Sequence, residues 1–188
     1  TGTFNDGEQL LSNIVFTRDP RLYESVIVNG LPGNLGWSSV SVGGDPYELW
    51  VGGSHAGSNS FNETMRYATG YENMKYYLGS SDYLRQNTQW VALRLSDLYL
   101  TYAEALLQAN NDHQGAVDQI DIVRARVGLP GLVQSNPGKR LLTDKDALIE
   151  ELLRERVCEL GMEDSRFFDL IRYKRADRFE KQLHGLLI

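Results

Sequence analysis

Acidic and basic side chains recur at helical spacing near the C-terminal end of this 188-residue sequence. Three glutamates follow at intervals of four residues, and an arginine, an aspartate and a second arginine then follow at intervals of three. In order they are Glu155, Glu159, Glu163, Arg166, Asp169 and Arg172. Carboxylates at this spacing repel one another by a few tenths of a kcal/mol per pair on an isolated helix. Cations from elsewhere in the fold should therefore lie between them, and Arg94, Arg124, Arg126 and Arg156 are available.

A carboxylate stripe of this kind could also hold a metal. Di-iron bundles need Glu-x-x-His pairs, and none of His55, His113 and His184 lies three residues after a glutamate. One cysteine and three histidines supply no zinc spacing either. We therefore predict no metal and no cofactor, and interpret the stripe as a structural salt-bridge network. Its predicted members are Glu155, Arg156, Glu159, Glu163, Arg166, Asp169 and Arg172.

Catalytic patterns are also missing elsewhere in the sequence. There is no Gly-x-Ser-x-Gly nucleophile motif, and Gly53-Ser54-His55 stands alone. Glycoside hydrolysis needs two carboxyl groups roughly 5–10 Å apart across a cleft. Asp45, Glu48, Glu63 and Glu72 could be considered, but no spacing favours any pair. We predict that the chain has no catalytic residues.

A glycine-rich segment, residues 30–81, carries many aromatic side chains and no helical periodicity. Long irregular segments inside a domain are usually functional or disordered, and the aromatic content argues against disorder. A sugar ring offers an apolar face and a rim of hydroxyls, which suits exposed aromatic side chains. Trp37, Tyr47 and Trp50 are the candidate ligand-binding residues, although an aromatic that only packs a loop is the commoner role. Trp90 opens a helix and is expected in the core.

Apolar residues recur at helical spacing from residue 83 onward. A first helix has the stripe Val91, Leu95, Leu98, Tyr102 and Leu106, and a second has Ala116, Ile120, Val123 and Val127. The short link between them predicts an antiparallel pair. The pair resembles one tetratricopeptide-type unit, which alone cannot cover its apolar faces.

Two further helices are expected after the loop at residues 130–142. Thr143 and Asp146 open the third in a near capping-box arrangement. Its predicted buried stripe is Ile149, Leu153, Val157 and Leu160. The fourth follows Gly161 and is predicted to bury Phe167, Leu170 and Ile171.

Charge and composition exclude several partners. The net charge of −6 disfavours nucleic acid, whose phosphates require clustered lysine and arginine. The single cysteine, Cys158, excludes an internal disulfide. No apolar run approaches the ~20 residues that span a bilayer, and the first residues lack the features of a signal peptide.

Four separate stretches match, in order, motifs of one known family. The first three are Asp19-Pro20-Arg21-Leu22-Tyr23, Thr69-Gly70-Tyr71 with Lys75 and Tyr76, and Leu93-Arg94-Leu95-Ser96-Asp97-Leu98-Tyr99-Leu100 running into Ala103-Glu104-Ala105. The fourth is Glu155-Arg156, Glu159-Leu160, Glu163, Arg166, Phe168-Asp169-Leu170 and Arg172. With these motifs the chain resembles the SusD/RagB family, the outer-membrane glycan-binding lipoproteins of Bacteroidetes.

This resemblance implies a mainly α, SusD-like α-helical fold with tetratricopeptide-like helical hairpins. The chain would be a C-terminal fragment forming one domain, 1–188, with a loop-rich layer at 1–82 and a helical part at 83–188. It implies a non-catalytic protein at the surface of the outer membrane that binds a glycan and passes it to a SusC-like TonB-dependent transporter. Its only membrane attachment would be an N-terminal lipid anchor, which this chain lacks. Two alternatives remain open: a protein-interaction scaffold without a glycan site, and a glycan-cleaving enzyme.

Overall fold

The computed structural model describes residues 18–31, 71–76 and 90–181 of the chain. The chain divides into two compact units, one of Thr1–Gln89 with Gln182–Ile188 and one of Trp90–Lys181. The described regular structure is mainly helical, as the sequence predicts. Most of the predicted loop-rich layer, and with it Trp37, Tyr47 and Trp50, lies outside the described residues. The division of the chain at residues 82 and 83 therefore stays a prediction.

In the first unit, a short helix leads into a two-stranded ladder. Helix α1 (Pro20–Ser25) begins at Asp19, whose carboxylate accepts a hydrogen bond from the Arg21 backbone N–H at 3.0 Å. Proline at the first helical position suits this start because it has no N–H to leave unpaired. Strand β1 (Val26–Ile27) pairs antiparallel with β2 (Glu72–Asn73). The strand partner is thus distant in sequence and does not lie directly across the turn at Asn29 and Gly30.

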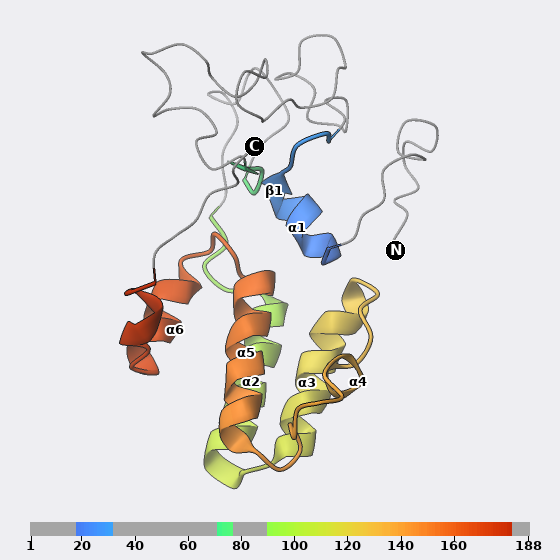
Figure 1. The fold of residues 1–188 in the computed structure, drawn as a ribbon, viewed down its shortest axis with the longest axis vertical. Coiled ribbons are helices and arrows are strands. Elements are labelled where there is room, and N and C mark those ends of the chain that lie inside the picture. Colours follow the sequence, from blue (N-terminus) through green and yellow to red (C-terminus); the bar gives the residue numbers. More distant parts are fainter. Residues whose placement is uncertain (1–17, 32–70, 77–89, 182–188) are drawn as a thin grey trace. The chain divides into compact units, whose positions relative to one another are not determined.

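The second unit is built on a helical hairpin. Helices α2 (Leu95–Asn110) and α3 (His113–Arg126) pack against each other and run antiparallel, as predicted (Figure 1). The turn is tight because Asn111 adopts a left-handed conformation with φ of 53° and Asp112 caps α3 by accepting from Gly115 N–H at 2.8 Å. Gly128, with φ of +73°, ends the hairpin. That conformation favours glycine because it has no Cβ to clash.

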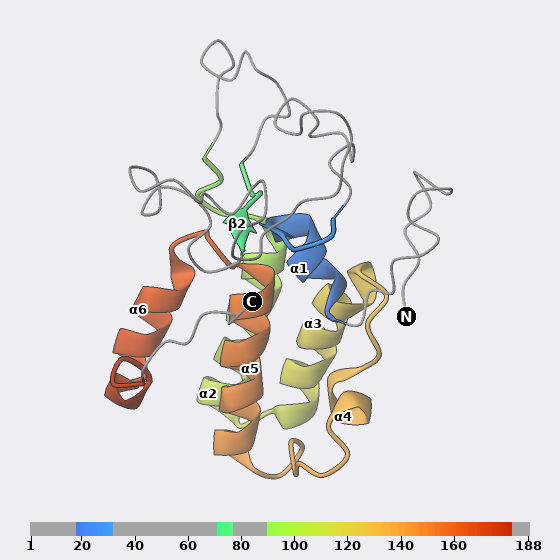
Figure 2. The same cartoon turned by 45° about the horizontal axis from the view of Figure 1, so that its top comes forward.

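The rest of this unit surrounds the hairpin. After α4 (Leu132–Ser135), helix α5 (Lys145–Glu159) packs against both α2 and α3. Helix α6 (Ser165–Arg172) packs against α5 and leads to the short 3-10 helix η2 (Ala176–Arg178). Figures 1 and 2 show α6 and α4 on opposite sides of the layer formed by α2, α3 and α5. The N-cap of α5 is Asp144, one residue after the predicted start at Thr143.

The core of the second unit lies between α2, α3 and α5. The stripe predicted for α3 is largely confirmed, because Ala116, Ile120 and Val123 are buried while Val127 is half-buried. For α5, Leu153 and Leu160 are buried as predicted, whereas Ile149 and Val157 are half-buried. The sequence reading of α5 missed Leu148 and Leu152, which are fully buried.

The prediction for α2 chose the wrong face, and the prediction for α6 is correct for Leu170 alone. On α2, Leu100, Ala103 and Leu107 are buried, while the predicted stripe Val91, Leu95, Leu98 and Tyr102 is exposed and Leu106 is half-buried. On α6, Leu170 is buried but Phe167 and Ile171 are exposed. Trp90, expected in the core, is exposed as well. The physical reason in α6 is that charged side chains hold its polar edge against α2 and α5, so its apolar side turns outward.

Within the described residues, no helix combines the length and apolar character that crossing a bilayer requires.

Candidate functional site

A row of buried glutamates runs along α5. Glu151, Glu155 and Glu159 are 5%, 3% and 3% exposed and lie four residues apart, so all three point the same way. A buried carboxylate is costly unless a cation and hydrogen bonds compensate it. Arg124 of α3 meets Glu155 at 2.8 Å, and Arg126 meets Glu159 at 3.1 Å. Glu151 pairs with Lys139 and, at 3.5 Å, with Arg154.

Arg94, the N-cap residue of α2, binds the C-terminal end of this row of glutamates. Its guanidinium meets Glu159 Oε1 at 2.6 Å and Glu163 Oε2 at 2.8 Å, and it donates to the Glu159 backbone carbonyl at 2.5 Å. A further short hydrogen bond goes to the Ser96 hydroxyl. Burial alone would lower the pKa of Arg94, but the hydrogen bonds to Glu163 and Glu159 outweigh it and raise that pKa. The pair of carboxylates therefore fixes the segment before α2 against the end of α5.

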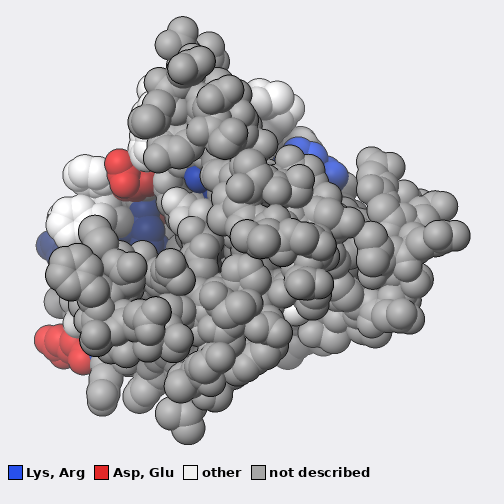
Figure 3. Space-filling model, turned by 90° about the horizontal axis from the view of Figure 1, so that it is seen from above, with Lys and Arg blue, Asp and Glu red and all other residues white. Residues whose placement is uncertain are grey.

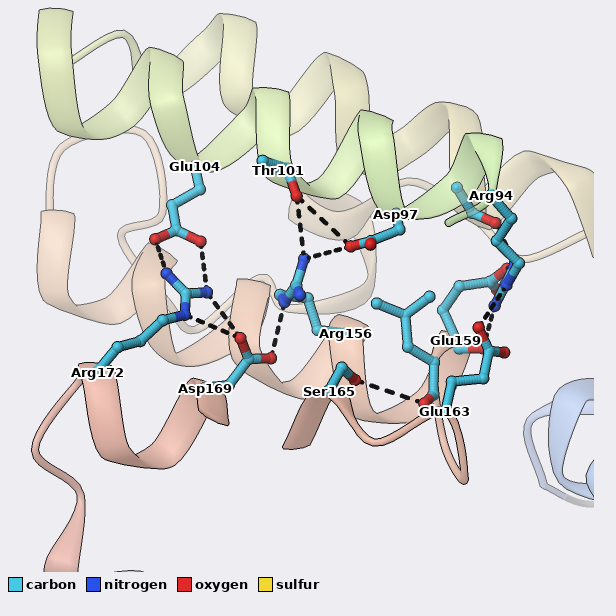
Figure 4. A network of polar contacts seen from close by, with 12 residues as sticks. Arg94, Asp97, Thr101, Glu104, Arg156, Glu159, Glu163, Ser165, Asp169 and Arg172 are labelled. Atoms are coloured by element: carbon cyan, nitrogen blue, oxygen red, sulfur yellow. Dashed lines mark hydrogen bonds and ion pairs between the residues drawn. The ribbon is translucent and has the colours of Figure 1, made fainter. Parts of the chain in front are cut away.

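A second chain of ion pairs joins α2, α5 and α6 (Figure 4). Arg156 of α5 donates to Asp169 of α6 at 2.7 Å and to Asp97 of α2 at 3.0 Å. Arg172 of α6 meets the other oxygen of Asp169 at 2.8 Å and pairs with Glu104 of α2 through both carboxylate oxygens. Such two-point contacts between a guanidinium and a carboxylate fix orientation as well as distance.

The electrostatics of this second chain follow from its geometry. Burial would lower the pKa of Arg172, but its hydrogen bonds to Glu104 and Asp169 outweigh burial and raise it. The neighbouring Tyr173 also has a raised pKa, first because burial disfavours its charged form and then because Glu104 lies close by. With raised pKa values, Arg172 stays charged and Tyr173 stays neutral near neutral pH, which is typical of groups in a structural network.

The structure pairs most residues of the predicted network, but not all of them. It brings six of them into ion pairs with near neighbours: Glu155, Arg156, Glu159, Glu163, Asp169 and Arg172. Arg166 differs, because within the described ranges it forms no ion pair and donates only to the Leu153 carbonyl at 3.5 Å. Figure 3 shows both acidic and basic side chains of the described residues at the surface.

Sequence reasoning overlooked other members of this network. Glu151 continues the stripe one turn before Glu155, so its spacing alone could have identified it. Asp97 and Glu104 lie seven residues apart on α2, two turns of one face. Lys139 comes from the loop before α5, where no periodicity indicates a partner.

Two hollows adjoin α6 in this unit. One, of about 380 Å³, is lined mainly by charged residues of α5, α6 and η2. The other, of about 620 Å³, is lined mainly by apolar and aromatic residues, and Arg166 and Leu170 line both. No group of three or more His, Cys, Asp or Glu side chains suited to hold a metal ion occurs in the described part of the chain. The candidate ligand-binding residues Trp37, Tyr47 and Trp50 lie outside that part.

Comparisons with known proteins agree on one family. The model of the SusD family matches residues 2–185. A SusD-like protein from Bacteroides fragilis, whose crystal structure is known, is 26% identical with a TM-score of 0.60; the match covers 86% of this chain and 29% of that one. A protein named BT4246 shares the fold at 24% identity and a TM-score of 0.61, with 86% of this chain and 26% of that one covered.

The chain thus spans less than a third of either solved structure. None of the curated proteins matches it. The family model nevertheless extends over almost the whole sequence, and the helical fold agrees with both solved structures. This chain therefore belongs to the SusD family.

Proposed function

We propose that this chain is part of a non-catalytic, glycan-binding lipoprotein at the surface of the outer membrane. It captures an oligosaccharide or polysaccharide and passes it to a SusC-like TonB-dependent transporter. The observation that carries the proposal is the match of the SusD family model over residues 2–185. The ion-pair network supports it, because the carboxylates of that network are committed to arginine and lysine partners and hold helices together.

The proposed ligand-binding residues are Trp37, Tyr47 and Trp50. Flat aromatic side chains suit the apolar face of a sugar ring and need no charged anchor or cofactor. Capture before transport needs modest affinity and quick release, and aromatic stacking without a covalent step provides both.

Tryptophan fluorescence of the 188-residue chain, titrated with a panel of plant, host and microbial oligosaccharides, tests this proposal. The chain has three tryptophans, so Trp37→Ala and Trp50→Ala are compared with Trp90→Ala as the matched control. We expect saturable quenching that one of the first two substitutions abolishes and that Trp90→Ala leaves intact. A cooperatively folded chain that shows no saturable response to any glycan would contradict glycan binding.

One observation favours the alternative of a protein-interaction scaffold. Large apolar side chains are exposed on α2 and α6, among them Leu95, Leu98, Phe167, Phe168 and Ile171. A scaffold would bind a protein partner through such surfaces and would stay silent in the glycan titration. The enzyme alternative predicts release of reducing ends with a bell-shaped pH dependence, which the same oligosaccharide panel can detect.

A further inference from the structure

The charged hollow beside α6 carries an excess of positive charge. Its volume of about 380 Å³ lies within the ~300–1,000 Å³ that is common for small-molecule sites. Among the residues that the structure describes, two carboxylates line it, those of Glu150 and Glu151. The cations that line it are Lys139, Arg154, Arg166, Arg175 and Arg178. In a chain with a net charge of −6 this is a local reversal of sign.

Both carboxylates are already shared between cations. Glu150 pairs with Arg175 and, at 2.9 Å, with Arg178. Glu151 pairs with Lys139 and Arg154. Asp177, which lies outside the lining, adds contacts of 3.0 Å to Arg175 and 3.4 Å to Arg178. Counted over the described residues, and even with Asp177 included, the positive charges of the lining exceed the negative charges around them.

Arg166 is the cation of this lining that meets no carboxylate in the described part of the chain. Its one hydrogen bond there, to the Leu153 carbonyl, is long at 3.5 Å. The residue is half-buried, so water only partly compensates its charge. A guanidinium presents planar donors that match the two oxygens of a carboxylate or a sulfate. An anionic group entering the hollow would supply a partner for the Arg166 guanidinium.

Arg166 also lines the neighbouring hollow, whose other described lining residues are apolar or aromatic except for Asp164. Phe167, Phe168 and Phe179 gather there, with ring centroids 5.7 Å apart for Phe167 and Phe168 and 5.9 Å apart for Phe167 and Phe179. All three rings are exposed. Aromatic side chains beside a guanidinium that pairs with no carboxylate of the described residues suit a ligand that combines an apolar ring face with a negative charge.

We propose that Arg166 and the aromatic residues Phe167, Phe168 and Phe179 bind an acidic sugar residue. The carboxylate or sulfate of the sugar pairs with the guanidinium, and the ring lies against the aromatic side chains. This inference rests on the proposed function, glycan binding, and specifies the ligand as an anionic glycan. It also adds a binding surface beyond Trp37, Tyr47 and Trp50.

Isothermal titration calorimetry with paired ligands tests the inference on the 188-residue chain. One pair is an oligogalacturonate and its methyl ester; the other is a sulfated dextran oligosaccharide and its unsulfated form. Because hydrogen bonds to a charged group are strong, we expect the anionic member of at least one pair to bind roughly tenfold more tightly or better. The pair that shows the preference identifies carboxylate or sulfate as the group recognised.

Three variants assign that preference to residues. Arg166→Gln should abolish it, whereas Arg140→Gln, which removes an exposed arginine outside both hollows, should leave it intact. Phe168→Ala should weaken anionic and neutral ligands by the same factor. If Arg166→Gln lowers the melting temperature sharply, Arg166→Lys replaces it; this variant keeps the charge but loses the planar donors and should retain only part of the preference.

The outcomes separate the two proposals. Equal affinity for anionic and neutral ligands, or equal losses in Arg166→Gln and Arg140→Gln, would overturn the acidic-sugar inference while glycan binding stands. Glycan binding that depends on Trp37 or Trp50 but not on Arg166 or Phe168 would overturn it too. A folded chain that binds none of these oligosaccharides and none of the wider panel would overturn both.

Discussion

Arg156 links three helices through a single guanidinium. It lies on α5 and contacts Asp97 of α2 and Asp169 of α6, and it is 7% exposed while Asp169 is 2% exposed. A buried ion pair is poor proof of net stabilisation, because removing two charges from water is costly. Its loss is a different matter, since the partner left behind remains buried without compensation. Arg156 is therefore the residue at which the network can be tested most directly.

We predict that Arg156→Met lowers the free energy of unfolding by about 3–5 kcal/mol. The lower end is more consistent with the geometry, because Asp169 keeps its contact with Arg172. Urea unfolding followed by circular dichroism measures the change. Arg140→Met is the control: it removes an exposed arginine that pairs with no carboxylate in the described residues and should change stability by less than about 0.5 kcal/mol. Equal unfolding midpoints for the two variants would contradict a role for the network in stability.

Tyr173 provides a pH test of the same region. Its pKa in the folded chain is raised above the ordinary 10.0, first by burial and then by Glu104. At a pH between the pKa of the unfolded chain and the higher pKa of the folded chain, Tyr173 has lost its phenolic proton in the unfolded chain but still holds it in the folded chain. The contribution of Tyr173 is therefore complete below about pH 10 and is lost as the pH rises through the folded-state pKa.

We predict that stability falls more steeply with pH above about pH 10 in the parent chain than in Tyr173→Phe, which has no phenolic proton to lose. Thermal unfolding at a series of alkaline pH values measures this slope. Tyr102→Phe, a change at an exposed tyrosine of α2, serves as the control and should leave the slope as it is. If stability falls equally with pH in the parent and in Tyr173→Phe, the pKa of Tyr173 does not differ between the folded and the unfolded chain.

At the scale of single residues, the sequence indicates which side chains are charged on one helical face but not which partner each meets. Glu155, Glu159 and Glu163 could be grouped because of their fixed spacing, although Glu163 lies in the turn after α5. Their partners come from α2 and α3, and the choice of cation depends on how those helices cross. Arg166 illustrates the limit. Its spacing is that of the network, yet in the structure it lines the two hollows beside α6.

At the scale of helices, α3 could be predicted because it has one apolar face, whereas α2 has two. One stripe, Leu100, Ala103 and Leu107, is buried, and the other, which includes Leu95 and Leu98, is exposed. Both stripes satisfy helical spacing, so periodicity cannot distinguish them. On α6 the ion pairs of Asp169 and Arg172 decide the orientation. A rule that places apolar residues inside fails there because the buried neighbours of α6 are charged.

The two faces of α2 can be distinguished by a pair of matched substitutions. Leu107 is 0% exposed and Leu95 is 64% exposed. We predict that Leu107→Ala costs about 2–5 kcal/mol, because it leaves a cavity in the core of the hairpin. Leu95→Ala should stay within about 0.5 kcal/mol of the parent. Urea unfolding of both variants measures the difference, and a larger loss for Leu95→Ala would favour the stripe that the sequence predicts.

At the scale of the whole chain, family motifs predicted more than helical periodicity did. Motifs such as Asp19-Pro20 and Glu155-Arg156 led to the SusD/RagB resemblance, and the family match over residues 2–185 agrees with it. Motifs of a family report its shared framework, because ion pairs and helix caps tolerate little change. Ligand contacts need only suitable side chains on a surface, so no fixed spacing marks them. The predicted roles of Trp37, Tyr47 and Trp50 therefore stay predictions.

The exposed apolar side chains of the unit Trp90–Lys181 have a consequence for the chain in solution. Leu98 on α2 and Ile171 on α6 are both exposed, and each has further exposed apolar neighbours on its own helix. Exposed apolar surfaces of this kind tend to mark interaction sites or to promote association. The net charge of −6 opposes association at low ionic strength, and salt screens that repulsion.

We predict that the chain self-associates and that association increases between about 0.05 and 0.5 M salt, as the Debye length shortens. Sedimentation velocity at both salt concentrations measures it. The double variant Leu98→Gln/Ile171→Gln should sediment as a monomer under both conditions, because it replaces apolar surface on each helix. Leu142→Gln, the same kind of change at an exposed leucine in the loop before α5, should behave like the parent. Equal association of the double variant and Leu142→Gln would contradict this prediction. It would show that the exposed apolar side chains of α2 and α6 do not drive association.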